Sequence, residues 1–218
     1  SRRVIEGESS ASPPWTTRIA SSSCSRGARR PSRPETRACR RPGARSVLDL
    51  ALQVVLLADA LDQVELADPK MLSAPFCYLA GHKLVEFNPA ERRNFERYVR
   101  NGGFVFVDDC NHDIDGLFAK SFETQMASIF GPRALAKLPR RHPLYSSFFS
   151  FPDGPPATSY ELNGWGDDLV HDYLKGIDID GRLGVLYSNK DYGCEWDYDW
   201  RNKRFQREDN TKFAGNIV

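Results

Sequence analysis

The stretch GGFVFVDDCNHDIDG, residues 102–116, decides the fold of this chain. It begins with a glycine pair, continues as a short apolar run over 104–107 and ends in four carboxylates, a thiol and an imidazole. A short apolar run between turn signals is typical of a fully buried strand. Open α/β sheets bind ligands just beyond the carboxyl ends of such strands. The stretch therefore predicts a central strand and the position of a site.

The residues before this stretch predict a strand–helix–strand unit. The run PFCYL, residues 75–79, indicates a second buried strand. Asn88, Pro89 and Glu91 suit the N-cap, the first and the third positions of a helix that runs to about 101 and ends at the glycine pair. Strand, helix and strand at this spacing predict a right-handed βαβ unit.

The rest of the chain extends this pattern into one α/β domain over 47–218. Helical spacing favours helices at 47–60 and 118–130, and apolar runs favour strands at 63–66, 135–138 and 181–188. Residues 152–168, rich in Gly, Pro and Asp, predict a lid-like loop. We expect a three-layer sandwich with a mostly parallel central sheet, and a last helix that the end of the chain cuts off.

Residues 1–46 do not show the pattern of a folded segment. They are rich in Arg, Ser and Pro and have almost no aliphatic periodicity, so little apolar surface is available to offset the entropy of ordering. A basic arm and a targeting segment are alternative interpretations. We favour a disordered or aberrant start, since this composition is typical of GC-rich DNA translated out of frame.

The composition excludes some classes of binding partner but does not indicate a reaction. The net charge is +1, and the aromatic stretch CEWDYDW, residues 194–200, carries acids that would repel phosphates, so we expect no nucleic acid. No apolar run is long enough for a membrane span, so we expect none, and we expect no intact signal peptide in this chain. The five cysteines form neither a CxxC pair nor a zinc spacing.

The candidate site residues follow the strand at 104–107. Carboxylates and an imidazole this close together suit a divalent metal, although Asp residues that shape a turn and cap the next helix explain the same pattern. Whether a metal or another cofactor binds stays open. The candidates for catalysis are Asp108, Asp109, Cys110 and His112. The candidates for ligand binding are His82, Asp113, Asp115 and His171, and residues 160–172 are expected to cover the site.

Cys110 follows a strand end, where a nucleophile is often found, but its neighbouring charges are not those that activate a thiol. A reactive cysteine needs a histidine partner and a lowered thiol pKa, whereas the neighbouring carboxylates raise it. A passive cysteine is therefore the alternative interpretation.

Four segments together resemble a bacterial domain-of-unknown-function family, number 4159. They are YLAGH at 78–82, RYVRNGGF at 97–104 running into the two aspartates, YSN at 187–189 and KFAGNIV at 212–218. The resemblance covers about 47–218 and implies the class I glutamine amidotransferase-like fold, which is flavodoxin-like. It also implies a bacterial protein, without distinguishing cytoplasm from periplasm.

The residues expected of a glutaminase are replaced in this chain. Class I amidotransferases carry a Gly-x-Cys-x-Gly elbow after the equivalent strand, and here Asp108 stands where that cysteine would be, with Cys110 two residues later. A His-x-Glu pair is absent too. We therefore expect a domain that binds a small molecule or a protein without glutaminase activity. The alternative is a hydrolase, with or without metal, that uses the cluster at 108–115.

Overall fold

The computed structural model describes residues 16–20, 61–196 and 208–218. The helix predicted at 47–60 and most of the segment 1–46 lie outside these residues, as does the aromatic stretch after residue 196. Within the described part, no helix is long and apolar enough to cross a bilayer.

A seven-stranded mixed sheet forms the centre of the described part, with the strand order β2-β1-β3-β4-β7-β6-β5. The strands are β1 (Thr16–Ala20), β2 (Leu61–Val64), β3 (Phe76–Gly81), β4 (Phe104–Asp109), β5 (Ala136–Lys137), β6 (Lys175–Ile179) and β7 (Arg182–Ser188). Strand β4 pairs in parallel with both of its neighbours, β3 and β7, and the other neighbouring pairs of the described sheet are antiparallel. The predicted α/β class is confirmed, and the sheet is mixed: parallel pairing, which we expected for most of the sheet, occupies its centre, with antiparallel pairs on both sides. Local patterns do not encode the direction of a strand's neighbour.

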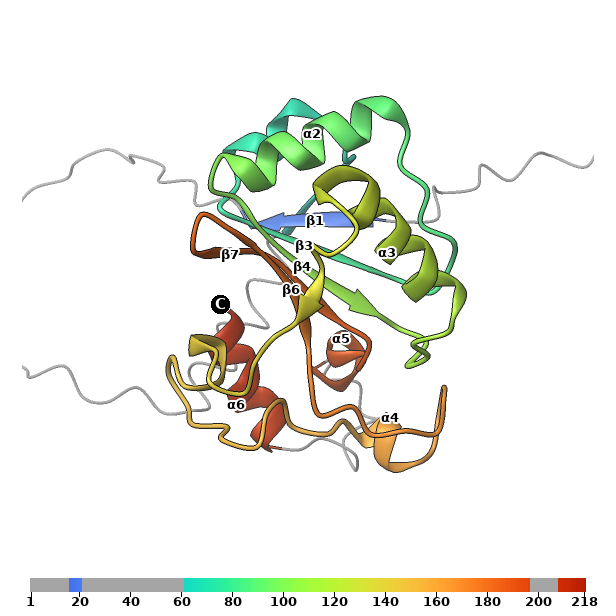
Figure 1. The fold of residues 1–218 in the computed structure, drawn as a ribbon, viewed down its shortest axis with the longest axis vertical. Helices are drawn as coiled ribbons and strands as arrows, with labels where there is room; N and C mark the ends of the chain where they lie inside the picture. Colours follow the sequence, from blue (N-terminus) through green and yellow to red (C-terminus); the bar gives the residue numbers. More distant parts are fainter. Residues whose placement is uncertain (1–15, 21–60, 197–207) are drawn as a thin grey trace, which may run out of the picture.

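Helices cover both faces of this sheet (Figure 1). Figure 1 shows α2 (Pro89–Arg100) and α3 (Leu117–Phe130) on one side, and α5 (Tyr192–Trp196) and α6 (Glu208–Ile217) on the other. The remaining short elements are η1 (Pro69–Ser73), η2 (Pro143–Tyr145) and α4 (Ser159–Leu162).

The predicted βαβ unit is present as β3, α2 and β4, with the two strands parallel and adjacent. The side chain of Asn88 accepts hydrogen bonds from the backbone N–H groups of Ala90 and Glu91, and the Glu91 carboxylate accepts from the Asn88 N–H. This capping box satisfies N–H groups that the first turn of a helix leaves without partners. Gly102, with φ +107°, follows the last turn in a conformation that favours glycine.

Alternate residues of the central strands build two separate cores. Val105 and Val107 on β4 face α2 and α3, together with Cys77 and Leu79 on β3. Phe104 and Phe106 face the opposite side, where Phe76 and Tyr78 pair with them in register. The pleat alternates side chains between the two faces. Side chains of β4 therefore pack against the helices on both faces of the sheet.

Three elements differ from the sequence-based expectation. Strand β2 lies two residues before the predicted 63–66, and β6 was not predicted. Thr16–Ala20 form β1, which pairs with both β2 and β3, although they lie in the segment expected to be disordered. Thr, Ile and Thr suit a strand, but five such residues inside an Arg- and Pro-rich segment are too short a signal to stand out.

Candidate functional site

Asp108 is a buried carboxyl at the end of β4, on the same face of the sheet as Phe106. Its Oδ2 accepts a hydrogen bond of 2.7 Å from the Gly193 N–H, and the Tyr78 hydroxyl lies 3.3 Å from the same oxygen. A Cβ atom added at Gly193 would overlap the Tyr78 hydroxyl oxygen. Only a glycine lets α5 approach this closely, so α5 closes the edge of the sheet directly over Asp108.

Burial raises the pKa of Asp108 to about 8, and the nearby Asp191 carboxylate adds to the effect. The Gly193 N–H opposes this shift by stabilising the charged form. The other carboxyl oxygen, Oδ1, is buried without a hydrogen-bond partner in the described part of the chain. Burial and the neighbouring carboxylate therefore favour the protonated, neutral form of Asp108.

Asp109 points to the opposite face and is also buried. Its Oδ1 accepts a 2.9 Å hydrogen bond from the Asn111 N–H, and the Tyr187 hydroxyl lies 3.5 Å from Oδ2. Burial raises the pKa of Asp109 to about 7. The two neighbouring acids thus serve different layers of the fold and do not form one carboxylate pair.

His112 is buried in a strained backbone conformation, with φ +54°. Its Nε2 lies 3.4 Å from Asp191 Oδ2, and its ring stacks on Tyr160 with the centroids 4.9 Å apart. Its Nδ1 is buried with no partner among the described residues. Asp191 also has a positive φ, of 52°, and accepts a hydrogen bond from the Cys194 N–H. His112 and Asp191, both with a positive φ, therefore contact each other at this edge of the sheet.

Asp113 and Asp115 take part in local turn structure. Asp113 Oδ1 accepts from the Asp115 N–H at 2.9 Å, and the exposed Asp115 pairs with Lys120. The next helix, α3, begins after Gly116, which provides no side-chain cap. Asp109 and Asp113 both bond to the N–H group two residues on, which is the geometry of an Asx turn. This matches the turn-forming interpretation of these acids and not the helix-capping one.

His82 lies at the same sheet edge, one residue beyond the end of β3. Its carbonyl oxygen accepts a 2.9 Å hydrogen bond from the Asn111 side chain, and its own side chain is exposed. Gly81 pairs in register with Asp109, as expected for parallel neighbours. The structure therefore brings the segments of His82 and Asp109 together, with the imidazole in solvent and the carboxyl inside.

Cys110 meets a second cysteine that sequence analysis did not connect with it. Its thiol is hydrogen-bonded to that of Cys194, in α5, and both residues are partly buried. This contact raises the pKa of the Cys110 thiol well above its usual range, and burial and the carboxylate of Asp191 raise it further. Cys110 is consequently not an activated nucleophile.

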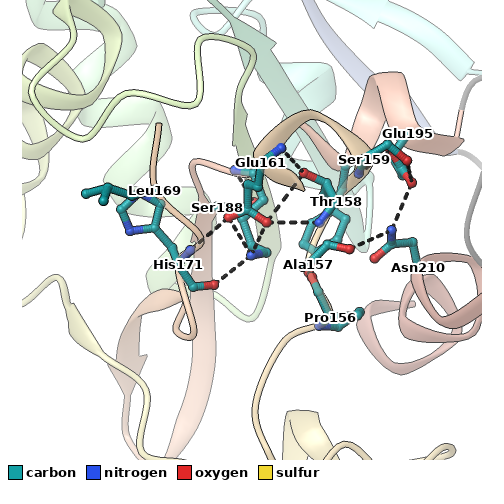
Figure 2. Close-up of polar contacts among 12 residues, drawn as sticks. Pro156, Ala157, Thr158, Ser159, Glu161, Leu169, His171, Ser188, Glu195 and Asn210 are labelled. Carbon is teal, nitrogen blue, oxygen red and sulfur yellow. Dashed lines mark hydrogen bonds and ion pairs between the residues drawn. The ribbon is translucent and has the colours of Figure 1, made fainter. Parts of the chain in front are cut away.

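A fully buried lysine organises the segment that follows. Lys190, two residues beyond β7, donates to both carboxylate oxygens of Glu161, at 2.7 and 2.6 Å, and to the His171 carbonyl at 2.6 Å. The Glu161 carboxylate also accepts from the backbone N–H groups of Thr158 and His171 (Figure 2). All three ammonium hydrogens and both carboxylate oxygens are satisfied. This ion pair therefore fixes the two ends of residues 158–171.

A second buried carboxylate joins the same segment to α5 and α6. Glu195 accepts from the backbone and the hydroxyl of Ser159, at 3.1 and 2.8 Å, and from the Asn210 side chain at 2.9 Å (Figure 2). Sequence analysis missed Glu161, Lys190 and Glu195. Lys190 and Asp191 could have been found, because they follow the apolar run at 181–188 as the acids follow 104–107.

The predicted covering segment lies over His112. Tyr160 stacks on the His112 ring, and the Asp167 N–H donates to the His112 carbonyl at 3.0 Å. The His171 imidazole contacts Asp167 Oδ2 at 2.8 Å, so this candidate ligand-binding side chain is engaged inside the cover. No group of three or more His, Cys, Asp or Glu side chains in 61–196 and 208–218 is arranged to hold a metal ion.

Comparison with known proteins adds a family but no activity. A family model described as a domain of unknown function, DUF4159, matches residues 47–218. No curated protein matches the chain.

Proposed function

Because the chain belongs to this family of domains of unknown function, we propose its role from the geometry: a non-catalytic protein-binding domain on an amidotransferase-like scaffold. Binding uses the apolar loop, which we define as residues 162–170. The partner is a protein that presents an apolar surface.

The exposed apolar side chains of this loop carry the proposal. Leu162, Trp165, Leu169 and Val170 are 53–54% exposed, and all four lie within nine residues. Single exposed apolar residues are common on any surface, but a cluster of large ones marks interaction sites. Trp is also enriched among the residues that dominate binding energy.

Polar contacts with the rest of the protein hold the loop in place, which lowers the conformational entropy lost on binding. Glu161 at its start and His171 at its end are joined through the buried Lys190. Between them, Asp167 accepts from the Ile114 N–H and contacts the His171 ring. Leu169 points away from the Glu161 network (Figure 2). Asp167 thus faces the protein, while the four apolar side chains are exposed to solvent.

The acids at 108–115 support a non-catalytic role. A hydrolase needs an ionised base or an activated nucleophile at its site. The pKa of Asp108 is raised to about 8 by burial, and Asp109 and Asp113 each accept a hydrogen bond from the backbone N–H group two residues further on. These groups satisfy the fold's own hydrogen bonds, which supports a structural role for them over a hydrolytic one.

Site-specific photocrosslinking tests the proposal. A photoreactive phenylalanine analogue replaces Trp165 in the full chain, and a matched variant carries it at Phe148, which is 69% exposed but outside the apolar loop. We expect one protein from the native source to be captured through position 165 only. Its affinity for the wild-type chain, measured by calorimetry, should fall at least tenfold in Trp165→Ser and Leu169→Ser and stay unchanged in Phe148→Ser.

Equal crosslinking from both positions, or an affinity that the loop substitutions leave unchanged, would overturn the proposal. Hydrolysis of a substrate that is lost in Asp109→Asn but kept in Trp165→Ser would support the alternative hydrolase.

A further inference from the structure

Two cysteines 84 residues apart in sequence meet at the carboxyl edge of β4. From this contact we propose that Cys110 and Cys194 form a reversible thiol–disulfide pair, which covalently joins the end of β4 to α5. The proposal does not depend on the protein-binding role of the apolar loop.

Backbone contacts on both sides hold the two thiols in place. The Cys110 N–H donates to the Gly81 carbonyl at 2.9 Å, which extends the pairing of β4 with β3 by one residue. The Cys194 N–H donates to Asp191 Oδ1 at 3.3 Å, and the neighbouring Gly193 N–H donates to Asp108. Cys194 thus follows Gly193, which bonds to Asp108, and Cys110 lies two residues after Asp108 in the chain, so this contact brings the two cysteine segments together.

Cys77 shows the contrasting environment within the same sheet. It is fully buried in the core beneath α2 and α3, and its thiol is hydrogen-bonded to Tyr98. Cys110 and Cys194 are only partly buried, so a small oxidant reaches them more easily. Cys77 is therefore a matched internal control.

The oxidation balances with a low-molecular-weight disulfide as the oxidant. One cysteine, as thiolate, attacks the disulfide and releases one small thiol, which takes up a proton. The second cysteine attacks the resulting mixed disulfide and releases the other small thiol. Two protein thiols become one disulfide, and one small disulfide becomes two thiols.

The groups around the two thiols determine how fast the pair exchanges with a small disulfide. Hydrogen bonding to Cys194, burial and the carboxylate of Asp191 all raise the pKa of Cys110, which disfavours its thiolate. Exchange through Cys110 is therefore slow at neutral pH and accelerates as the pH rises.

Peptide mapping under non-reducing conditions tests the pair. The full, folded chain is equilibrated with oxidised glutathione, the remaining thiols are alkylated, and the protein is digested with trypsin. We expect a crosslinked product of peptides 101–120 and 191–201, while Cys77 stays in its alkylated peptide, 71–83. The product should disappear on reduction and in Cys110→Ser, and persist in Cys77→Ser.

A second measurement separates a fold-specific pair from random pairing. The oxidised chain should melt at a higher temperature than the reduced chain, and Cys194→Ser should remove the difference while keeping its circular dichroism spectrum. Two alkylated thiols at Cys110 and Cys194 after equilibration would overturn the proposal. So would a disulfide that forms equally well in urea, or pairing of Cys110 with Cys24 or Cys39.

Discussion

The ammonium of Lys190 lies within 2.7 Å of both carboxylate oxygens of Glu161, and neither side chain is exposed. Lys190 follows β7, whereas Glu161 belongs to α4. Burial lowers the pKa of Lys190, and the Glu161 carboxylate opposes that shift. The carboxylate thus stabilises the buried ammonium of Lys190, and residues 158–171 are attached to the sheet through this pair.

Removal of one member of this pair should be costly. Lys190→Met leaves the Glu161 carboxylate buried without its counter-ion, so we expect about 3–5 kcal/mol less unfolding free energy in urea titrations. The double variant Lys190→Met/Glu161→Gln should lose less than the two single losses combined. Lys212→Met is the control, because its partner Glu208 is largely exposed and solvent screens the pair, so little stability should be lost. Equal losses in Lys190→Met and Lys212→Met would contradict the structural role of the buried pair.

Phe106 tests the central position of β4. It is buried beneath α5 and α6, stacks on Tyr78 and contacts the Trp196 ring. Phe106→Ala should lower the unfolding free energy by about 3–5 kcal/mol, the usual range for a buried Phe. Phe148→Ala, at an exposed position, provides the comparison. Equal losses in the two variants would show that β4 is not central.

The approach of α5 to β3 can be tested with a pair of substitutions. Gly193→Ala would push a methyl group onto the Tyr78 hydroxyl, so we expect a clear fall in melting temperature. Tyr78→Phe removes the obstructing oxygen and should recover part of that loss in the double variant. Strictly additive losses in a thermal melt would mean that the two residues do not touch.

Asp108 should make the protein less stable as the pH rises. Its pKa in the folded chain, about 8, lies above the ordinary value of 3.8, so the folded state binds the proton more tightly than the unfolded state. Its stabilising contribution is full below about pH 4 and is lost progressively as the pH rises toward about 8. The pKa of Asp109, about 7, acts in the same direction.

Urea titrations between about pH 5 and about pH 8.5, a range set by these pKa values, check this dependence. Asp108→Asn should lose less stability across the range than the wild-type chain. Asp115→Asn, at an exposed position, should follow the wild type. An Asp108→Asn profile parallel to that of the wild type would show that Asp108 does not titrate there.

Strand β1 connects the family region to a segment outside it. The match begins at residue 47, yet Thr16–Ala20 lie between β2 and β3 in the sheet. Deletion of 1–46 removes the strand that β2 pairs with, so the melting temperature should fall. Deletion of 1–12 leaves β1 intact and is the control. An unchanged melting temperature in the longer deletion would show that the sheet does not need β1.

Local signals were sufficient for several elements and for the position of the acids. The bounds of α2 were predictable because Asn88, Glu91 and the glycine pair act within a few residues of the helix ends. The burial of β4 was predictable because the exposure of an apolar run to water is unfavourable. Asp108 was placed at a strand end for the same reason, although its partners were not.

The sequence by itself determined where the chain forms α2, β3 and β4, since capping, turns and apolar runs act over short distances. Only the tertiary structure decided that β1 and β6 run antiparallel to their neighbours, and that Glu161 meets Lys190 and Cys110 meets Cys194. Those contacts join residues far apart in sequence. Their geometry depends on how whole elements pack, and no local pattern encodes it.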